Sequence, residues 1–156
     1  MGRPVALFAV LAGLWPTLDP ALVEAPYFLT ADPERIDARF TRCGPGRGPA
    51  CVVDGDTFKL GQRKIRIVGI DAPETHRANC PEEARLGEAA TAELMRLLNQ
   101  GPFAMTGRID DLQDRYGRDL RVVTRERANG TTQSIAGDMR SSGLARRYLG
   151  SKASWC

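Results

Sequence analysis

Residues 53–74, which read VDGDTFKLGQRKIRIVGIDAPE, have carboxylates near their outer ends and arginines inside. Asp56 precedes one strand-like run, and Asp71 and Glu74 follow a second run that contains Arg66. Carboxylate and backbone oxygens are the ligands that a hard divalent cation takes, and two or three acids leave room for water and a phosphate. The stretch therefore predicts a cation site with a guanidinium group beside it.

Alternating polarity predicts the hairpin that would gather these acids. Apolar and polar residues alternate at residues 57–60 and again at 64–67, with a Gly-Gln pair between them as turn chemistry. Folding of this hairpin returns Asp56 to the neighbourhood of Asp71. A two-residue turn would put Asp56 and Arg66 on opposite strand faces, so we expect a longer turn, a bulge, or an Asp56 outside the regular ladder.

The sequence excludes two familiar kinds of site, an EF-hand and a catalytic triad. An EF-hand would need a bidentate Glu where Ile65 stands, and its carboxylate spacing differs. The chain has one histidine, His76, in a polar loop after Glu74, and without a second histidine or a paired nucleophile no catalytic triad can form. A loop histidine is usually solvent-exposed, and a minor catalytic or substrate-contact role for His76 stays open.

A second informative stretch lies at residues 114–118, which read Asp-Arg-Tyr-Gly-Arg. Arginines in a loop are by default a solvated surface, but here Tyr116 and Gly117 separate Arg115 from Arg118. Glycine lets the backbone bend to aim the second arginine. An arginine fork for a phosphate and a tyrosine ring for a base or sugar would act together.

Composition is compatible with one domain that has an anionic partner. The chain has 156 residues, of which 42% are hydrophobic, and this is enough for one domain with its own core and short for two. The formal net charge of +3 suits an anionic partner but is far below that of a protein that binds by charge alone.

The four cysteines predict disulfides. The cysteines are Cys43, Cys51, Cys80 and Cys156. The spacings between them match no CxxC zinc pattern. Three connectivities are open, and we favour Cys43 with Cys51, which are close across a Gly/Pro-rich loop, leaving Cys80 with Cys156.

Disulfides need an oxidising compartment, and the N-terminus offers a route to one. Arg3 precedes an apolar run at residues 5–15, whose length is that of a signal-peptide core, whereas a bilayer span needs about 20 residues. We predict that residues 1–25 are a signal peptide or a short uncleaved anchor, with a candidate cleavage site at residues 23–25. The protein would then be exported, and either periplasmic, secreted or membrane-tethered.

The rest of the chain supplies the elements that would position the site. Apolar residues recur at helical spacing over residues 81–99, and the alanines there indicate close packing on a sheet. Residues 26–40 are mixed and polar and hold at most a short helix. Its start would be at Asp32-Pro33-Glu34, which resembles an N-cap with proline at the first helical position. The other expected elements are strands at 103–109 and 120–124, a short helix at 134–142, and a tail at 149–156 in which Trp155 packs and Cys156 tethers the end.

Three motifs, in order along the chain, resemble the staphylococcal nuclease (thermonuclease) family. They are Asp54-Gly-Asp-Thr57, the segment from Arg66 to Asp71-Ala-Pro-Glu74, and Tyr116-Gly-Arg118, and the likeness continues through Gly143-Leu-Ala-Arg146. The resemblance implies an α+β, mainly β fold, a five-stranded OB-fold barrel with two packed helices, here stapled by disulfides. We expect residues 26–51 to be an N-terminal extension with a Cys43/Cys51 loop, and residues 52–156 to be the nuclease-like domain.

Carried over residue by residue, the resemblance implies a role for each motif position. Asp56 and Asp71 would ligate Ca²⁺ together with the backbone carbonyl of Ala72, which stands where the family more often has Thr. Glu74 would position or deprotonate the attacking water. Arg66 and Arg118 would neutralise the phosphate. The substrate contacts would be Arg115, Tyr116 and Tyr148.

The chain departs from the family pattern after Glu74 and at its end. The loop before the first helix is short and contains Cys80, and the C-terminal helix of the best-known members is missing. A Cys80–Cys156 bridge would replace the lost helix contacts, since closing so long a loop contributes about 4 kcal/mol in the chain-entropy model.

The resulting expectation is an exported, calcium-dependent nuclease that cleaves DNA and RNA with little sequence preference. Single-stranded or denatured substrates would be preferred, and we expect a monomer without an obligate protein partner. The main alternative is a non-catalytic OB-fold module that binds single-stranded nucleic acid or a protein, although such a module would not need the acids and arginines together. A structural envelope domain would explain only the cysteines.

Overall fold

The computed structural model describes residues 30–109, 113–148 and 150–156. The predicted signal peptide or anchor at residues 1–25, with its candidate cleavage site, lies outside the described residues. Among the helices of the described part, none is both long and apolar enough to cross a membrane.

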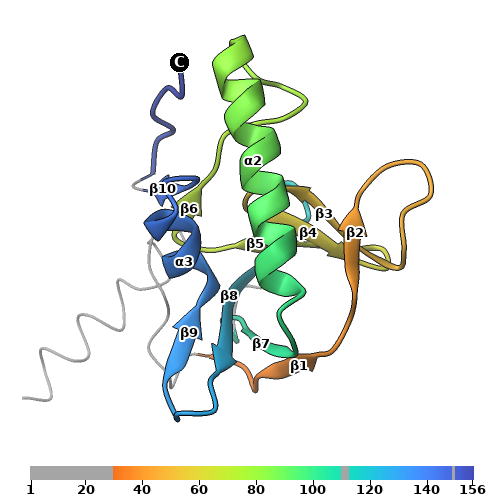
Figure 1. Ribbon diagram of the computed structural model, residues 1–156. Coiled ribbons are helices and arrows are strands. Elements are labelled where there is room, and N and C mark those ends of the chain that lie inside the picture. The colour runs from red at the N-terminus through yellow and green to blue at the C-terminus, as the bar shows by residue number, and fades with distance from the viewer. Residues whose placement is uncertain (1–29, 110–112, 149) are drawn as a thin grey trace, which may run out of the picture.

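A single curled sheet forms the body of the molecule (Figure 1). Its five central strands, in spatial order, are β7 (Phe103–Thr106), β8 (Asp119–Glu126), β5 (Arg63–Ile67), β4 (Thr57–Leu60) and β3 (Ala50–Asp54). All of these neighbours pair antiparallel except β5 and β8, which are parallel. This arrangement, with two helices packed on it, confirms the mainly β, OB-like fold expected from the sequence.

Three short strands pair with this sheet, two at its ends and one on β8. β1 (Glu34–Ile36) pairs with β7, β2 (Phe40–Arg42) runs parallel to β3, and β9 (Thr132–Ser134) pairs with β8. The sequence allowed at most a short helix within residues 26–40, and in the described part of this stretch strands form in its place. The unpaired edge of β7 offers backbone groups that β1 satisfies, and this pairing buries Ile36, so tertiary pairing overrides the local cap-like signal.

Helix α2 (Pro81–Leu98) covers the sheet, close to the bounds predicted for it (Figure 1). Its buried face consists of Ala90, Thr91, Leu94, Leu97 and Leu98, together with Glu83 and Gly87 near its start. Beneath it, three aromatic rings form the centre of the core with centroids 5.5 to 6.1 Å apart; they belong to Phe40, Phe58 and Phe103. The second predicted helix is α3 (Ile135–Ser141).

The start of α2 lies directly on the loop that follows β6 (Ile70–Asp71). A Cβ atom added to Gly87 would lie 2.5 Å from the carbonyl oxygen of Glu74, and one added to Gly55 would lie 2.7 Å from the Cβ of Ala72. No side chain fits at either place. The helix therefore packs directly on the backbone at residues 73–74, while the turn at Gly55 packs on Ala72.

This close approach makes Gly87→Ala a destabilising change. Alanine is intrinsically the better helix former, but its methyl group would push the backbone carbonyl of Glu74 away, and we expect a loss of about 1–3 kcal/mol in unfolding free energy by urea denaturation. Gly137→Ala in α3 is the matched control, because its nearest contact would be the Ser134 side chain at 3.3 Å. Equal effects at the two positions would contradict the packing argument.

The C-terminal segment returns to the sheet and then rises beside the N-terminal end of α2 (Figure 1). β10 (Arg146–Arg147) pairs antiparallel with β6, and residues 150–156 follow. The structure joins Cys43 to Cys51 and Cys80 to Cys156, the connectivity favoured from the sequence. The second bridge ties the tail to the N-cap residue of α2, and Trp155 is buried, with 8% of its surface exposed.

Candidate active site

The hairpin brings Asp56 and Arg66 together by placing Asp56 outside the strand ladder. The turn between β4 and β5 has only two residues, since Leu60 pairs with Arg63. β4 begins at Thr57, and the register between β3 and β4 shifts between residues 52 and 54. Of the three geometries considered from the sequence, the displaced Asp56 occurs, whereas the β4–β5 pairing is regular and the register shift lies on the other side of β4.

Asp56 and Arg66 form a buried ion pair, with 2.6 Å between Oδ2 and Nη1 and exposed fractions of 4% and 6%. Arg66 also donates to the carbonyl of Ile70, while Asp56 accepts from the Thr57 hydroxyl and the backbone N–H of Ala72. Burial alone would raise the pKa of Asp56, but the charge of Arg66 and these hydrogen bonds lower it below its usual range. Both groups are therefore charged and held in place.

Asp54 is a member of this cluster that the sequence reasoning did not select. Burial raises the pKa of its carboxyl to about 7, and the neighbouring negative charge of Asp56 adds to the shift. Its side chain also accepts a hydrogen bond from the backbone N–H of Asp56. The Asp-Gly-Asp sequence was the available signal, but a turn explained its first residue equally well.

The raised pKa of Asp54 predicts a pH dependence for the metal-free protein. Between about pH 4 and pH 7 the native state binds this proton more tightly than the unfolded state, so the contribution of Asp54 to stability falls as the pH rises. Asp54→Asn should gain roughly 1 kcal/mol or more over the wild type at pH 8 and little at pH 4. Urea denaturation in EDTA measures this, with Asp37→Asn, an exposed aspartate, as control. A difference that does not change with pH would contradict it.

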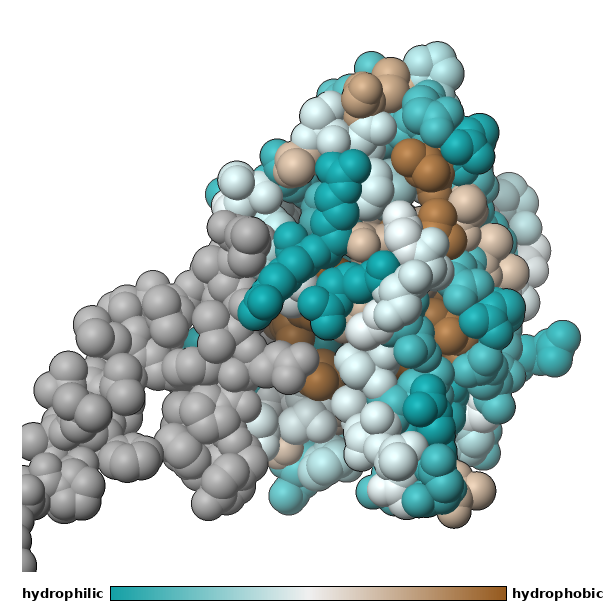
Figure 2. All heavy atoms as spheres, turned by 60° about the vertical axis from the view of Figure 1, so that its left-hand side comes forward, coloured by the Kyte–Doolittle hydropathy of each residue, from teal (hydrophilic) through white to brown (hydrophobic). Residues whose placement is uncertain are grey.

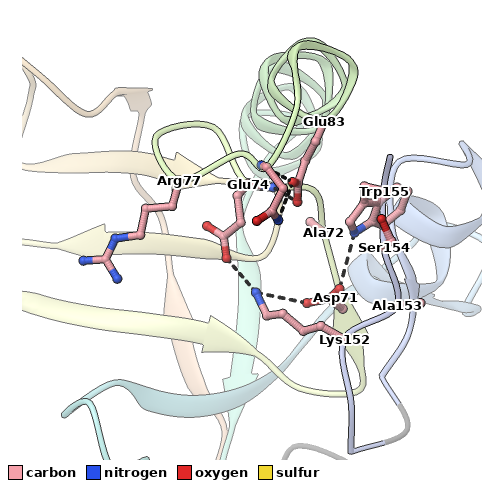
Figure 3. Close-up of a pocket in the computed structure, with 10 residues that line it drawn as sticks. Asp71, Ala72, Glu74, Arg77, Glu83, Lys152, Ala153, Ser154 and Trp155 are labelled. Atoms are coloured by element: carbon pink, nitrogen blue, oxygen red, sulfur yellow. Dashed lines mark hydrogen bonds and ion pairs between the residues drawn. The ribbon is translucent and has the colours of Figure 1, made fainter.

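Asp71 and Glu74 face a pocket of about 460 Å³ beside the C-terminal tail (Figure 3). Lys152 lies between the two acids, with its Nζ 2.6 Å from Glu74 Oε1 and 3.4 Å from Asp71 Oδ1. The indole N–H of Trp155 donates to Asp71 Oδ2 at 3.4 Å. The residues that line the pocket are Asp71, Ala72, Glu74, Arg77, Asn79, Glu83, Lys152, Ala153, Ser154 and Trp155.

Glu83 holds the loop that carries Glu74. Its buried carboxylate accepts from the backbone and side-chain N–H groups of Asn79 at 2.6 and 2.9 Å, and from the backbone N–H of Glu74 at 3.5 Å. Glu83 lies in the first turn of α2, where an acidic residue by itself indicates no role in a site. The hydrogen bonds to residues 74 and 79 show that it positions the loop.

The carboxylates offer oxygen ligands to a hard divalent cation, but not in their present arrangement. Asp71 Oδ1 is buried and, among the described residues, accepts no hydrogen bond, so an oxygen ligand is available there. Within residues 30–109, 113–148 and 150–156, however, no three Asp, Glu, His or Cys side chains converge tightly enough to hold a metal ion as they stand. One side of Asp56 is taken by Arg66, and Lys152 lies against the other two acids. Binding of a cation here would require the ammonium group to move away and the carboxylates to come closer together.

Arg118 is not in contact with these acids. Asp114 binds its guanidinium at 2.6 and 2.7 Å and also accepts from its backbone N–H, which fixes the turn at residues 114–118. Tyr116 is 66% exposed, and its ring lies 4.8 Å from the Arg115 guanidinium and 5.3 Å from that of Arg118. The three motif residues thus form a separate exposed cluster.

Tyr148 lies near Arg66, whereas His76 contacts its neighbour Thr75. Tyr148 follows β10, and its ring is 5.8 Å from the guanidinium of Arg66. The His76 ring is exposed and shares a hydrogen bond with the Thr75 hydroxyl. Of the predicted substrate contacts, only Tyr148 is thus close to the buried ion pair.

The family model described as "Staphylococcal nuclease homologue" matches residues 64–154, which is more than half of the chain. The chain belongs to this family. The match begins within β5 and includes Arg66, the acids at 71 and 74, the arginine–tyrosine cluster and most of the C-terminal tail.

Two proteins with nuclease names are similar to this family member. It is 38% identical over 88 residues to Endonuclease YhcR of Bacillus subtilis, covering 50% of this chain and 7% of that protein. It is 34% identical over 76 residues to the Thermonuclease of Staphylococcus hyicus, covering 46% of this chain and 44% of that protein. The similarity thus spans less than half the length of each relative.

Proposed function

We propose that this chain is a calcium-dependent nuclease that hydrolyses phosphodiester bonds of DNA and RNA with little sequence preference. The observation that carries the proposal is the buried Asp56–Arg66 pair beside Asp71 and Glu74 at an open pocket, in a chain of the staphylococcal nuclease family. A binding surface alone would gain little from a buried arginine fixed by a carboxylate, because that arrangement must offset the desolvation of two charges.

Each acid and arginine has a place in such a reaction. Attack on a phosphodiester builds negative charge on the nonbridging oxygens, and preorganised guanidinium groups stabilise it without rearrangement. Arg66 is already fixed by Asp56 and the Ile70 carbonyl. Glu74, whose side chain is 34% exposed, can accept a hydrogen bond or proton from water in the pocket.

Asp56, Asp71 and the backbone carbonyl of Ala72 would hold the calcium ion. Such an ion, when bound, supplies charge stabilisation to the phosphate oxygens. We propose that Arg118 exchanges Asp114 for the substrate phosphate, since the carboxylate holds the guanidinium in place near the surface until an anion arrives.

The exposed cluster suits an unpaired strand. The ring of Tyr116 is open to solvent between Arg115 and Arg118, so a base can stack on it while the phosphates meet the arginines. Tyr148, over Arg66, would meet the substrate nearer the scissile bond. Denatured DNA and RNA are the expected substrates.

The two disulfides support export to an oxidising compartment, which we propose together with a monomeric state. Figure 2 shows that the face around the C-terminal segment is mostly hydrophilic, with hydrophobic side chains only in small separate areas. A face of this kind is typical of a soluble surface and does not favour a large apolar interface.

Cleavage of heat-denatured DNA by the purified oxidised protein tests the proposal. We expect cleavage with Ca²⁺, loss of it in EDTA, and a fall of about a hundredfold or more in Arg118→Ala. Arg127→Ala, in an exposed turn, is the matched control and should leave the rate unchanged. DNA binding without cleavage in any divalent metal would refute the enzyme and favour the non-catalytic binding module.

A further inference from the structure

Lys152 lies where the candidate site would need its cation. The ammonium group contacts Glu74 Oε1 at 2.6 Å and Asp71 Oδ1 at 3.4 Å, and Figure 3 shows the side chain reaching between the two acids. Asp71 Oδ1 is the buried oxygen that accepts no hydrogen bond from the described residues. Among the described residues, Asp71 forms its ion pair with Lys152.

The tail segment that carries Lys152 is anchored at both of its ends. Before it, β10 pairs with β6, the strand that carries Asp71. After it, Trp155 is buried and donates to Asp71, and Cys156 is bonded to Cys80 at the start of α2. Arg146 joins the two ends, since its guanidinium lies 3.7 Å from the Trp155 ring and donates to the Ser154 carbonyl.

We propose that Lys152 is an internal cation that competes with the divalent metal for Asp71, with Glu74 holding the ammonium group in place, so that the disulfide-tethered tail sets the affinity of the site for its metal. The inference rests on the proposed function, because it needs a cation that binds Asp71. A lysine ammonium and a dication cannot both contact the same carboxylate, since they repel each other strongly at such distances. The metal must therefore displace Lys152, and its affinity falls by the free energy of that ion pair.

Calcium titration by calorimetry on the full oxidised chain tests this without relying on activity. Lys152→Met keeps most of the side-chain length and removes the charge, and we expect its affinity for Ca²⁺ to rise about five- to tenfold. Lys152→Arg, which keeps a cation, should stay within about twofold of the wild type. Lys59→Met on β4 removes the same net charge away from the pocket and should have no such effect.

Removing the Cys80–Cys156 bridge tests the competition in a second, independent way. Cys80→Ser/Cys156→Ser keeps an N-cap oxygen for α2 and frees the last residues, so the affinity for Ca²⁺ should rise in the same direction as in Lys152→Met. Circular dichroism and urea denaturation would establish that each variant is folded.

The outcomes separate the two proposals. Unchanged or weaker calcium binding in Lys152→Met, or an equal rise in Lys59→Met, would overturn the competition and leave the nuclease proposal standing. Absence of calcium binding in the wild type and in every variant would overturn both the competition and the calcium dependence. Calcium binding that appears only in Lys152→Met would support the competition in its strongest form.

Discussion

Replacing Glu74 by glutamine should lower the rate of phosphodiester cleavage by about a hundredfold or more while leaving the protein folded. Glutamine has the same shape but cannot take a proton from water, and loss of a positioned general base typically lowers a rate by about 10²–10⁴. The hydrogen bond that Glu83 accepts from residue 74 comes from the backbone N–H and survives the change. Initial rates on denatured DNA at saturating Ca²⁺ measure the effect.

Glu82→Gln is the matched control for this experiment. Glu82 lies at the exposed start of α2, where it pairs with Arg85, and the change removes one carboxylate charge without altering the pocket. Its rate should equal that of the wild type. A Glu74→Gln rate within about threefold of wild type, with calcium binding intact, would show that another group activates the water.

Replacing Arg66 by methionine should destabilise the protein by about 3–5 kcal/mol and abolish cleavage. Asp56 is almost completely buried, and without the guanidinium its charge would lack the ion pair that offsets its desolvation. The carbonyl of Ile70 would also lose its donor. Urea denaturation in EDTA measures the stability loss separately from any effect of calcium.

A double variant separates the structural role of Arg66 from its chemical role. Arg66→Met/Asp56→Asn removes both charges, so it should recover a large part of the lost stability while cleavage remains absent. Arg63→Met is a suitable control, because it removes an arginine from the other end of β5, where the side chain is 43% exposed. If Arg66→Met were as stable as the control, the buried charge of Asp56 would have found another partner.

Local patterns in the sequence were sufficient to predict the central elements of the fold and to establish the order of the motifs. The alternation at residues 57–67 predicts β4 and β5, and the helical repeat at residues 81–99 predicts α2, because each pattern reports one buried face of one element. The displaced Asp56 was among the geometries that the sequence allowed, since a two-residue turn puts Asp56 and Arg66 on opposite faces if both stay in the ladder. Cysteine spacing likewise favoured the connectivity that the structure has.

Contacts between distant segments decided the rest. β1 forms because β7 has an open edge, which no local signal in residues 26–40 reveals. Arg118 pairs with Asp114 and not with the site acids, because the turn at residues 114–118 closes on itself. Lys152 meets Glu74 across 78 residues of chain, and neither a repeat nor a motif marks that lysine. Periodicity records which face of an element is buried, whereas the partner of a single charged side chain depends on where the folded chain brings it.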